Sequence, residues 1–287
     1  MVLNVHPKGR EFVAEVRDLD LSVPLDAHSV KAIDEALDRF AVLVFRRQNL
    51  EPALQLRFAE NFGILDLGFK KTSKSVDRLG HAEVLDISNV DETGQVADRS
   101  HRKIVGNLAN QLWHSDSSFQ DPPARYSMLH AVVLPTIGGE TEFADMRGAY
   151  DALTDERKRQ IDGLHAQHFA LHSRFLLGDT DYTQEQRDAL PAVSWPIVRR
   201  HPGSGRSLLF IGSHASHVPE LSLAEGRLLL MDLLEHATQS EFVYRHTWQP
   251  GDLVMWDNRS TLHRGRPFDL SVRRELRRTT TLETNAV

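Results

Sequence analysis

The sequence predicts a mixed, β-rich fold: a sandwich or open barrel of short strands supported by helices. Strand-like segments dominate from Leu112 onward, whereas helical segments lie early and in the middle of the chain. A doubly wound parallel sheet is disfavoured, because strands and helices do not alternate regularly and there is no glycine-rich phosphate loop. With 287 residues, 40% of them hydrophobic, and no linker-like shift in composition, the chain is expected to form one domain, residues 1–287.

The composition narrows the range of partners. A formal net charge of −6 gives no basic footprint for a nucleic acid. No apolar stretch is long enough to span a bilayer, and the first residues lack the pattern of a secretion signal, so a cytoplasmic location is expected. The absence of cysteine excludes disulfides, thiolate metal sites and cysteine nucleophiles. The composition therefore gives no sign of a nucleic-acid or membrane partner.

Two helices and two strands are expected in the first third of the chain. Apolar residues recur at helical spacing in residues 29–40 and 54–62, and the apolar run 41–45 between them indicates a short buried strand. Another strand is expected at residues 84–88. Residues 96–110 show no clear period, which is typical of a functional loop or lid.

The remainder of the chain is expected to be mostly strands. Two helices interrupt them, one over residues 145–163 and one beginning at Ser222, where Ser222 and Glu225 have the spacing of a capping box. The strands are expected at residues 128–134, 141–144, 167–171, 207–211, 242–248, 253–256 and 273–282.

A metal site is predicted from two histidines and one carboxylate. On a strand, His114 and Asp116 would project to the same face and could bind one ion together. His263, just after the apolar strand 253–256, is the candidate third ligand. Two histidines and a carboxylate form the facial triad of non-heme Fe(II), with three positions open for a bidentate cosubstrate and O2. Taken alone, a His-x-Asp pair arises often by chance, and most such pairs are surface polar residues or a hydrogen-bonded core pair.

Arginines near the C-terminus make the metal hypothesis more specific. Arg274, Leu276 and Arg278 share one face of a strand, and the leucine between the arginines suggests that this face points inward. Inward cations need anions, and a guanidinium binds a carboxylate through two parallel hydrogen bonds. A dicarboxylate cosubstrate and an acidic substrate would supply them. The alternative is a solvated edge strand whose charges discourage aggregation.

Together these residues resemble the Fe(II)- and 2-oxoglutarate-dependent dioxygenases of the taurine dioxygenase group. The resemblance runs from about Phe12 to Leu282. Within the group, residues 107–119 and 173–182 are most similar to the 2,4-dichlorophenoxyacetate dioxygenases. The other matching motifs are Phe58-x-x-x-Phe62-Gly63, Gly138-Gly139-Glu140-Thr141-x-Phe143-Ala144-Asp145 and Trp256-Asp257-Asn258-Arg259.

The resemblance implies a double-stranded β-helix, or jelly roll, with a helical or loop insertion and the triad at one mouth. It implies that Arg274 binds the distal carboxylate of 2-oxoglutarate with help from the Thr141 hydroxyl. Arg278 would lie near the inner carboxylate of the cosubstrate and the acidic group of the substrate.

Four further residues are candidates for contact with the substrate. Asn110 matches a substrate-contacting asparagine of the taurine enzymes. Those enzymes have a histidine after the Phe-Gly segment where this chain has lysines; the difference argues against taurine and makes Lys71 a candidate anion ligand. His214 and His217 follow a predicted strand and could border the pocket, although a structural role is an equal alternative.

The implied reaction is hydroxylation of the carbon next to the ether oxygen of an aryloxyacetic acid such as 2,4-dichlorophenoxyacetate. The products would be a phenol and glyoxylate, while 2-oxoglutarate and O2 yield succinate and CO2. One alternative is a taurine-like dioxygenase acting on alkyl sulfonates or sulfates. An alternative of another class is a non-redox metal hydrolase or a metal-binding protein. The sequence leaves open the ring substituents, the acceptance of chiral propionates and the presence of a homo-oligomer.

Overall fold

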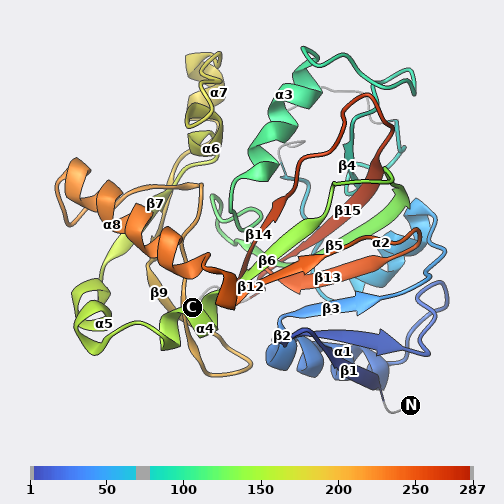
Figure 1. The fold of residues 1–287 in the computed structure, drawn as a ribbon, viewed down its shortest axis with the longest axis horizontal. Coiled ribbons are helices and arrows are strands. Elements are labelled where there is room, and N and C mark those ends of the chain that lie inside the picture. Colours follow the sequence, from blue (N-terminus) through green and yellow to red (C-terminus); the bar gives the residue numbers. More distant parts are fainter. Residues whose placement is uncertain (1–2, 69–77, 285–287) are drawn as a thin grey trace.

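A seven-stranded sheet crosses the molecule (Figure 1). The structure, a computed structural model, describes residues 3–68 and 78–284. The strand order of the sheet is β1-β2-β3-β13-β5-β15-β4, and every pairing is antiparallel except that of β2 with β3. The strands are β1 (Asn4–Lys8), β2 (Arg10–Arg17), β3 (Val42–Phe45), β4 (Leu85–Ser88), β5 (Ala124–Val133), β13 (Leu253–Asp257) and β15 (Glu275–Leu282).

Helices α1 (Ala27–Phe40) and α2 (Pro52–Glu60) pack on one face of this sheet. Their buried side chains form one apolar cluster with residues of β3, β5 and β13. Helix α1 begins where the Asp26 side chain accepts a hydrogen bond from the Ser29 backbone, and α2 begins with Pro52, which suits the first helical turn. The expected helices are therefore confirmed, each starting two residues earlier than the apolar period indicated.

A smaller sheet, of order β12-β6-β14, covers the opposite face. It consists of β6 (Thr141–Asp145), β12 (Val243–His246) and β14 (Thr261–Gly265). Phe143 of β6 meets Trp256 of β13 edge to face, with ring centroids 5.4 Å apart, within a buried cluster shared by both sheets. The expected mixed, β-rich architecture is thus observed, with two sheets in face-to-face contact.

A third group of elements flanks the sheets and appears on the left of Figure 1. It has its own apolar cluster, whose members come mainly from the strands and from helices α4, α5 and α8. The strands are β7 (His165–His168), β8 (Val193–Pro196), β9 (Val198–Arg200), β10 (Ser207–Leu209) and β11 (Ala215–His217). The helices are α4 (Met146–Asp151), α5 (Asp155–Ile161), α6 (His172–Phe175), α7 (Gln184–Asp188) and α8 (Leu223–Ala237).

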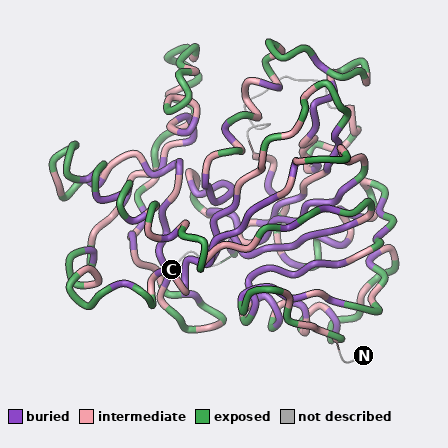
Figure 2. Tube along the Cα trace, viewed as in Figure 1, coloured by how far each residue is buried: buried purple, intermediate pink, exposed green. Residues whose placement is uncertain are grey.

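Figure 2 shows how burial follows this arrangement, with the central strands buried and the outlying helices exposed along much of their length. No helix within the described ranges is long and apolar enough to cross a membrane. The predicted capping box of α8 is present, since Ser222 and Glu225 exchange side-chain-to-backbone hydrogen bonds.

Three expected elements differ from the structure. Residues 96–110, expected to lack regular structure, contain α3 (Arg102–Leu108) and the start of a 3-10 helix, η2 (Ala109–Gln111). Helix α3 buries one residue, Ile104, so its sequence does not need apolar residues at helical spacing and shows no such pattern. The helix expected over 145–163 is two helices, because the Thr154 side chain caps a new start at α5. The strand expected at 167–171 lies earlier, as β7.

Candidate active site

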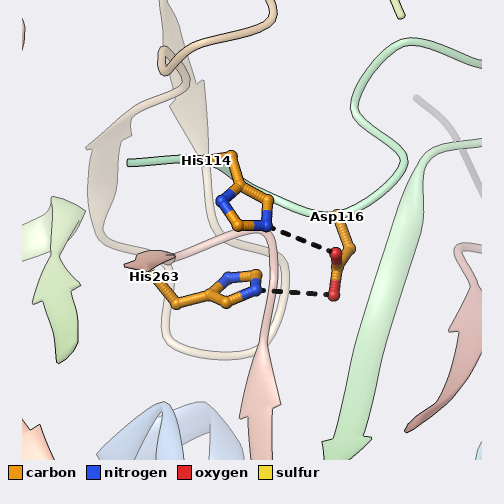
Figure 3. Close-up of side chains that lie close together, drawn as sticks. All are labelled: His114, Asp116 and His263. Carbon is orange, nitrogen blue, oxygen red and sulfur yellow. Dashed lines mark ion pairs between the residues drawn. The ribbon is translucent and has the colours of Figure 1, made fainter. Parts of the chain in front are cut away.

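Three buried side chains converge between the two sheets (Figure 3). The Nε2 atoms of His114 and His263 each lie 3.8 Å from one carboxylate oxygen of Asp116. One ligand atom from each residue lies within 4.8 Å of the other two, so a single ion can contact all three. The structure therefore brings together the three residues that the sequence predicted as metal ligands.

The segment that carries His114 and Asp116 is not the strand expected from the sequence. His114 forms an isolated antiparallel bridge with His263 of β14, through backbone N···O distances of 3.0 and 2.8 Å. Asp116 follows in a turn that includes Ser117 at φ 47°. The two side chains reach one point because the bridge and the turn direct them there, rather than because they alternate along a strand.

Burial keeps both imidazoles neutral, and a hydrogen bond also fixes the tautomer of His114. The Leu112 carbonyl, 2.8 Å from Nδ1 of His114, can only accept, so Nδ1 donates and Nε2 keeps its lone pair toward Asp116. Burial lowers the pKa of His114 and places the pKa of His263 well below its usual value. Both rings are therefore neutral near pH 7.

Asp116 is ionised although it is buried. Burial opposes its charge, but the positive charge of Arg278, aided by the hydrogen bond from Ser127, offsets that effect, and the pKa of Asp116 is lowered to about 2. The Nη1 atom of Arg278 donates a hydrogen bond to Oδ1 of Asp116 at 2.6 Å. A carboxylate and two neutral imidazoles form a donor set that fits Fe(II).

A cavity beside the triad contains the predicted cosubstrate residues. His114, His263, Thr141, Arg274 and Arg278 all line it. Arg274 is buried, and its Nη2 donates to the Gly139 carbonyl at 2.9 Å. Burial alone lowers its pKa to about 10, and no carboxylate of the described part of the chain pairs with it. A buried cation in this position is suited to a carboxylate ligand.

Thr141 lies on β6 with its hydroxyl directed into the same region. Its Oγ1 accepts a hydrogen bond from Nε1 of Trp248 at 3.1 Å. The indole N–H can only donate, so the proton of the Thr141 hydroxyl remains available for an acceptor such as a carboxylate.

A second cavity of about 440 Å³ adjoins the first and shares His114, Asn110 and Arg278 with it. His214 lines this second cavity, with its ring centroid 4.8 Å from that of Phe119, and burial keeps its pKa well below the usual value. The structure therefore brings Asn110 and His214 to the site.

Two predicted substrate residues are not placed there. His217 lines neither cavity; it is half-buried, with Nδ1 3.0 Å from the Ser216 hydroxyl, and the prediction of a pocket role is not supported by its position. Lys71 lies outside the described residues.

Sequence reasoning overlooked Arg174, which lines the second cavity together with Arg278. It lies on α6, and its pKa is lowered by burial despite the opposing influence of Tyr182 and Asp179. The available signal was the matching stretch 173–182, in which Arg174 is a basic residue among apolar neighbours.

A second histidine–carboxylate cluster, Asp38, His201 and Asp257, lies elsewhere in the fold. Nε2 of His201 lies 2.8 Å from Asp257, while its Nδ1 accepts a hydrogen bond from the Ser204 backbone at 3.0 Å. Arg259 also donates to both oxygens of Asp257. Because both ring nitrogens and the carboxylate have partners, this cluster is a hydrogen-bonded part of the core rather than a metal site.

A facial triad between two sheets, next to a buried arginine, defines a non-heme iron oxygenase. Residues 4–280 match the model of the taurine catabolism dioxygenase TauD, TfdA family, and the chain belongs to this family. It is accordingly a 2-oxoglutarate-dependent non-heme iron dioxygenase that uses Fe(II), 2-oxoglutarate and O2, as the sequence predicted.

Individual relatives are similar to this chain over nearly its whole length. The chain is 60% identical over 283 residues to an alpha-ketoglutarate-dependent 2,4-dichlorophenoxyacetate dioxygenase of Cupriavidus pinatubonensis. This match covers 99% of each of the two chains. It is 34% identical to an (S)-phenoxypropionate/alpha-ketoglutarate-dioxygenase of Delftia acidovorans, over 95% of this chain and 92% of the relative. The crystal structure of AAD-2 in complex with Mn(II) and N-oxalylglycine superimposes with a TM-score of 0.92 at 44% identity, covering 98% of each chain.

Proposed function

We propose that this enzyme hydroxylates aryloxyacetic acids such as 2,4-dichlorophenoxyacetate at the carbon next to the ether oxygen. The hydroxylated carbon then carries two oxygen substituents, and the product separates into a phenol and glyoxylate while 2-oxoglutarate becomes succinate and CO2. The observation that carries this substrate class is the 60% identity, over 99% of both chains, to a 2,4-dichlorophenoxyacetate dioxygenase.

His114, Asp116 and His263 would hold the iron. Their convergence, burial and charge states support this role, because the site offers two neutral imidazoles and one ionised carboxylate without needing to release protons. Bound Fe(II) supplies the activation of O2 at the expense of 2-oxoglutarate, and the protein supplies binding, orientation and exclusion of water.

Arg274 would bind the distal carboxylate of 2-oxoglutarate, and the Thr141 hydroxyl would donate a hydrogen bond to the same group. Both line the cavity beside the triad, and burial makes an anion at Arg274 favourable. Arg278 would lie between the inner carboxylate and the substrate's acidic group, since it lines both cavities.

The second cavity would receive the substrate. Arg278 and Arg174 supply positive charge for a carboxylate there, while Phe119 supplies an apolar surface for an aromatic ring; Asn110 and His214 add polar contacts. Helix α3 contributes Ile104 and Asn107 to the cavity walls, so the helix, rather than an irregular loop, would shield the reacting groups from water.

The proposed architecture is a double-stranded β-helix formed by the two facing sheets, within a single domain of residues 1–287. Support comes from the triad, whose ligands lie between those sheets, and from the match over 98% of the chain with AAD-2. The homo-oligomer and the cytoplasmic location considered from the sequence stay predictions.

Product analysis tests the proposed function. With Fe(II), 2-oxoglutarate and O2, the purified enzyme should release phenol from aryloxyacetates in proportion to succinate. The Asp116→Ala variant, which lacks one ligand, is the negative control and should form neither product. Release of sulfite or sulfate from alkyl sulfonates or sulfate esters, without phenol, would favour the taurine-like alternative. Turnover that needs neither O2 nor 2-oxoglutarate would instead indicate a hydrolase.

A further inference from the structure

The carboxylate of Asp116 is held by two hydrogen-bond donors. Ser127 Oγ lies 2.7 Å from Oδ2, and Arg278 Nη1 lies 2.6 Å from Oδ1. Ser127 is fully buried on β5, where Trp256 of β13 and Thr280 of β15 are its cross-strand neighbours. An ionised carboxylate can only accept, so the Ser127 hydroxyl must donate its one proton to Asp116.

Asn258, in the connection between β13 and β14, reaches the same point from the other side. Its Oδ1 accepts from Trp256 Nε1 at 3.0 Å and from the Asp116 backbone N–H at 3.2 Å. Both of these groups can only donate, which fixes the orientation of the amide. Its Nδ2 therefore faces Ser127 Oγ, at 2.9 Å, and donates to it.

The Ser127 hydroxyl has one orientation in which all of these hydrogen bonds are made. Its oxygen has two lone pairs, one facing the Asn258 amide and the other facing the Thr280 hydroxyl at 3.1 Å. The proton consequently points to Asp116. In a buried site, any other rotation would leave Asn258 or Asp116 with an unmade hydrogen bond.

We propose that Asn258 and Ser127 are positioning residues that fix the orientation of the Asp116 carboxylate for the iron. Asn258 holds residue 116 twice, directly at its backbone N–H and through Ser127 at its side chain. Neither residue lines the two cavities, so both act through Asp116. The inference rests on the proposed function only in taking Asp116 as a ligand, and it gives a role to the Trp256–Arg259 motif.

Metal affinity measured without turnover tests this inference. Mn(II) is titrated into the full chain while free Mn(II) is followed by electron paramagnetic resonance. Ser127→Ala and Asn258→Ala should each weaken binding about ten-fold or more, the range typical of partners that orient ligands. The double variant should lose less affinity than the sum of the two single losses, because one of the two contacts of Asn258 acts through Ser127.

Ser118→Ala is the matched control. Ser118 is equally buried and lies two residues from Asp116, but its hydroxyl contacts His168 rather than Asp116. The affinity of Ser118→Ala for Mn(II) should equal that of the wild type. The ligand-field absorption of bound Co(II) should change in Ser127→Ala and Asn258→Ala but not in the control, a difference that a general loss of stability would not produce.

Unchanged Mn(II) affinity in both single variants would overturn the inference, and so would fully additive losses in the double variant. If Asn258→Ala does not fold, the comparison of Ser127→Ala with Ser118→Ala decides alone. A wild-type protein that binds no Mn(II) would refute the ligand assignment itself, and the inference would fail with it. Wild-type binding together with inactivity on aryloxyacetates would refute the proposed substrate and leave the inference standing.

Discussion

Arg274 is a cation that the fold keeps buried among neutral groups. Its guanidinium contacts the Gly139 carbonyl, and burial is the cause of its lowered pKa of about 10. Removing it from water is unfavourable unless an anion offsets the cost. The distal carboxylate of 2-oxoglutarate, which we propose binds here, would supply that anion.

Arg274→Ala is expected to raise the KM for 2-oxoglutarate at least about 100-fold, because loss of one partner of a buried ion pair costs about 3–5 kcal/mol. Succinate formation measured against 2-oxoglutarate concentration gives the result. Arg273→Ala is the control, because Arg273 is next to Arg274 in the chain but its side chain is 43% exposed and pairs with Glu275. An unchanged KM in Arg274→Ala would place the distal carboxylate elsewhere.

Residue type and spacing indicated that His114, Asp116 and His263 could converge and that Arg274 could point inward, and the structure brings these residues to one site. Their individual roles came from the resemblance to a known family, because the residues alone left other interpretations open. The partners that position them were not predictable. Ser127 and Asn258 are ordinary polar residues whose role depends on contacts 11 and 142 positions away from Asp116. His217 was selected because it follows a predicted strand, but it lines neither cavity.

At the scale of elements, the connection leading into β6 shapes the cosubstrate cavity. Gly139 has φ +75°, and a Cβ there would lie 2.8 Å from Nε of Arg274. A side chain at this position is therefore excluded both by backbone conformation and by the guanidinium. The Gly-Gly motif noted in the sequence thus leaves room for the arginine.

Gly139→Ala should displace Arg274 and raise the KM for 2-oxoglutarate about ten-fold, in line with the cost of overpacking a buried site. Gly163→Ala is the matched control, because Gly163 has φ +73° but nothing within 4 Å of the added Cβ. Gly139→Ala should lose more stability in urea unfolding than Gly163→Ala, which has the strain of the positive φ without the close contact, and Gly139→Ala alone should affect the cosubstrate. Equal KM values for the two variants would contradict the close approach.

Elements with a strong apolar period or a cap were predicted well, and those shaped by tertiary contacts were not. Helices α1 and α8 combine buried apolar faces with capping side chains at Asp26 and Ser222. Helix α3 buries only Ile104 and gave no such pattern. The strand expected for His114 was wrong because its single bridge partner, His263, comes from a distant part of the chain.

At the scale of the whole molecule, metal binding is expected to stabilise the fold. The proposed ligands come from two segments far apart in the sequence, residues 114–116 and β14, so an ion joins them in the folded state but not in the unfolded chain. Mn(II) at about 100 times its Kd should add about 2.7 kcal/mol to the free energy of unfolding. Urea unfolding with and without Mn(II) measures this gain, which His263→Ala should lack; a gain in that variant would point to another site.

Acid is expected to destabilise the molecule through His168. This residue is buried on β7 against Phe210, and burial lowers its pKa to about 3 from the ordinary value of 6.5. The unfolded chain therefore takes up the proton first, and stability is lost as pH falls from about 6.5 toward 3.

The expected loss from this one group is about 2 kcal/mol between pH 7 and pH 5. Urea unfolding of the wild type and of His168→Gln at both pH values tests it, and the variant should lose correspondingly less. His28→Gln, at an exposed position on α1, should lose as much as the wild type. Identical pH dependence in all three proteins would assign acid sensitivity to other groups.

The backbone bridge between residues 114 and 263 joins a part of the polypeptide made early in translation to one made late. A nascent chain that still lacks β14 cannot offer the full triad to an ion, so the proposed metal site is complete only after β14 has been made. The ion would then be selected by a preformed site with fixed ligand spacing. Ligands on an unfolded chain would instead favour the metal ion with the highest intrinsic affinity. Metal choice at the proposed site would then depend on the geometry of the folded chain and on which ions are available to it.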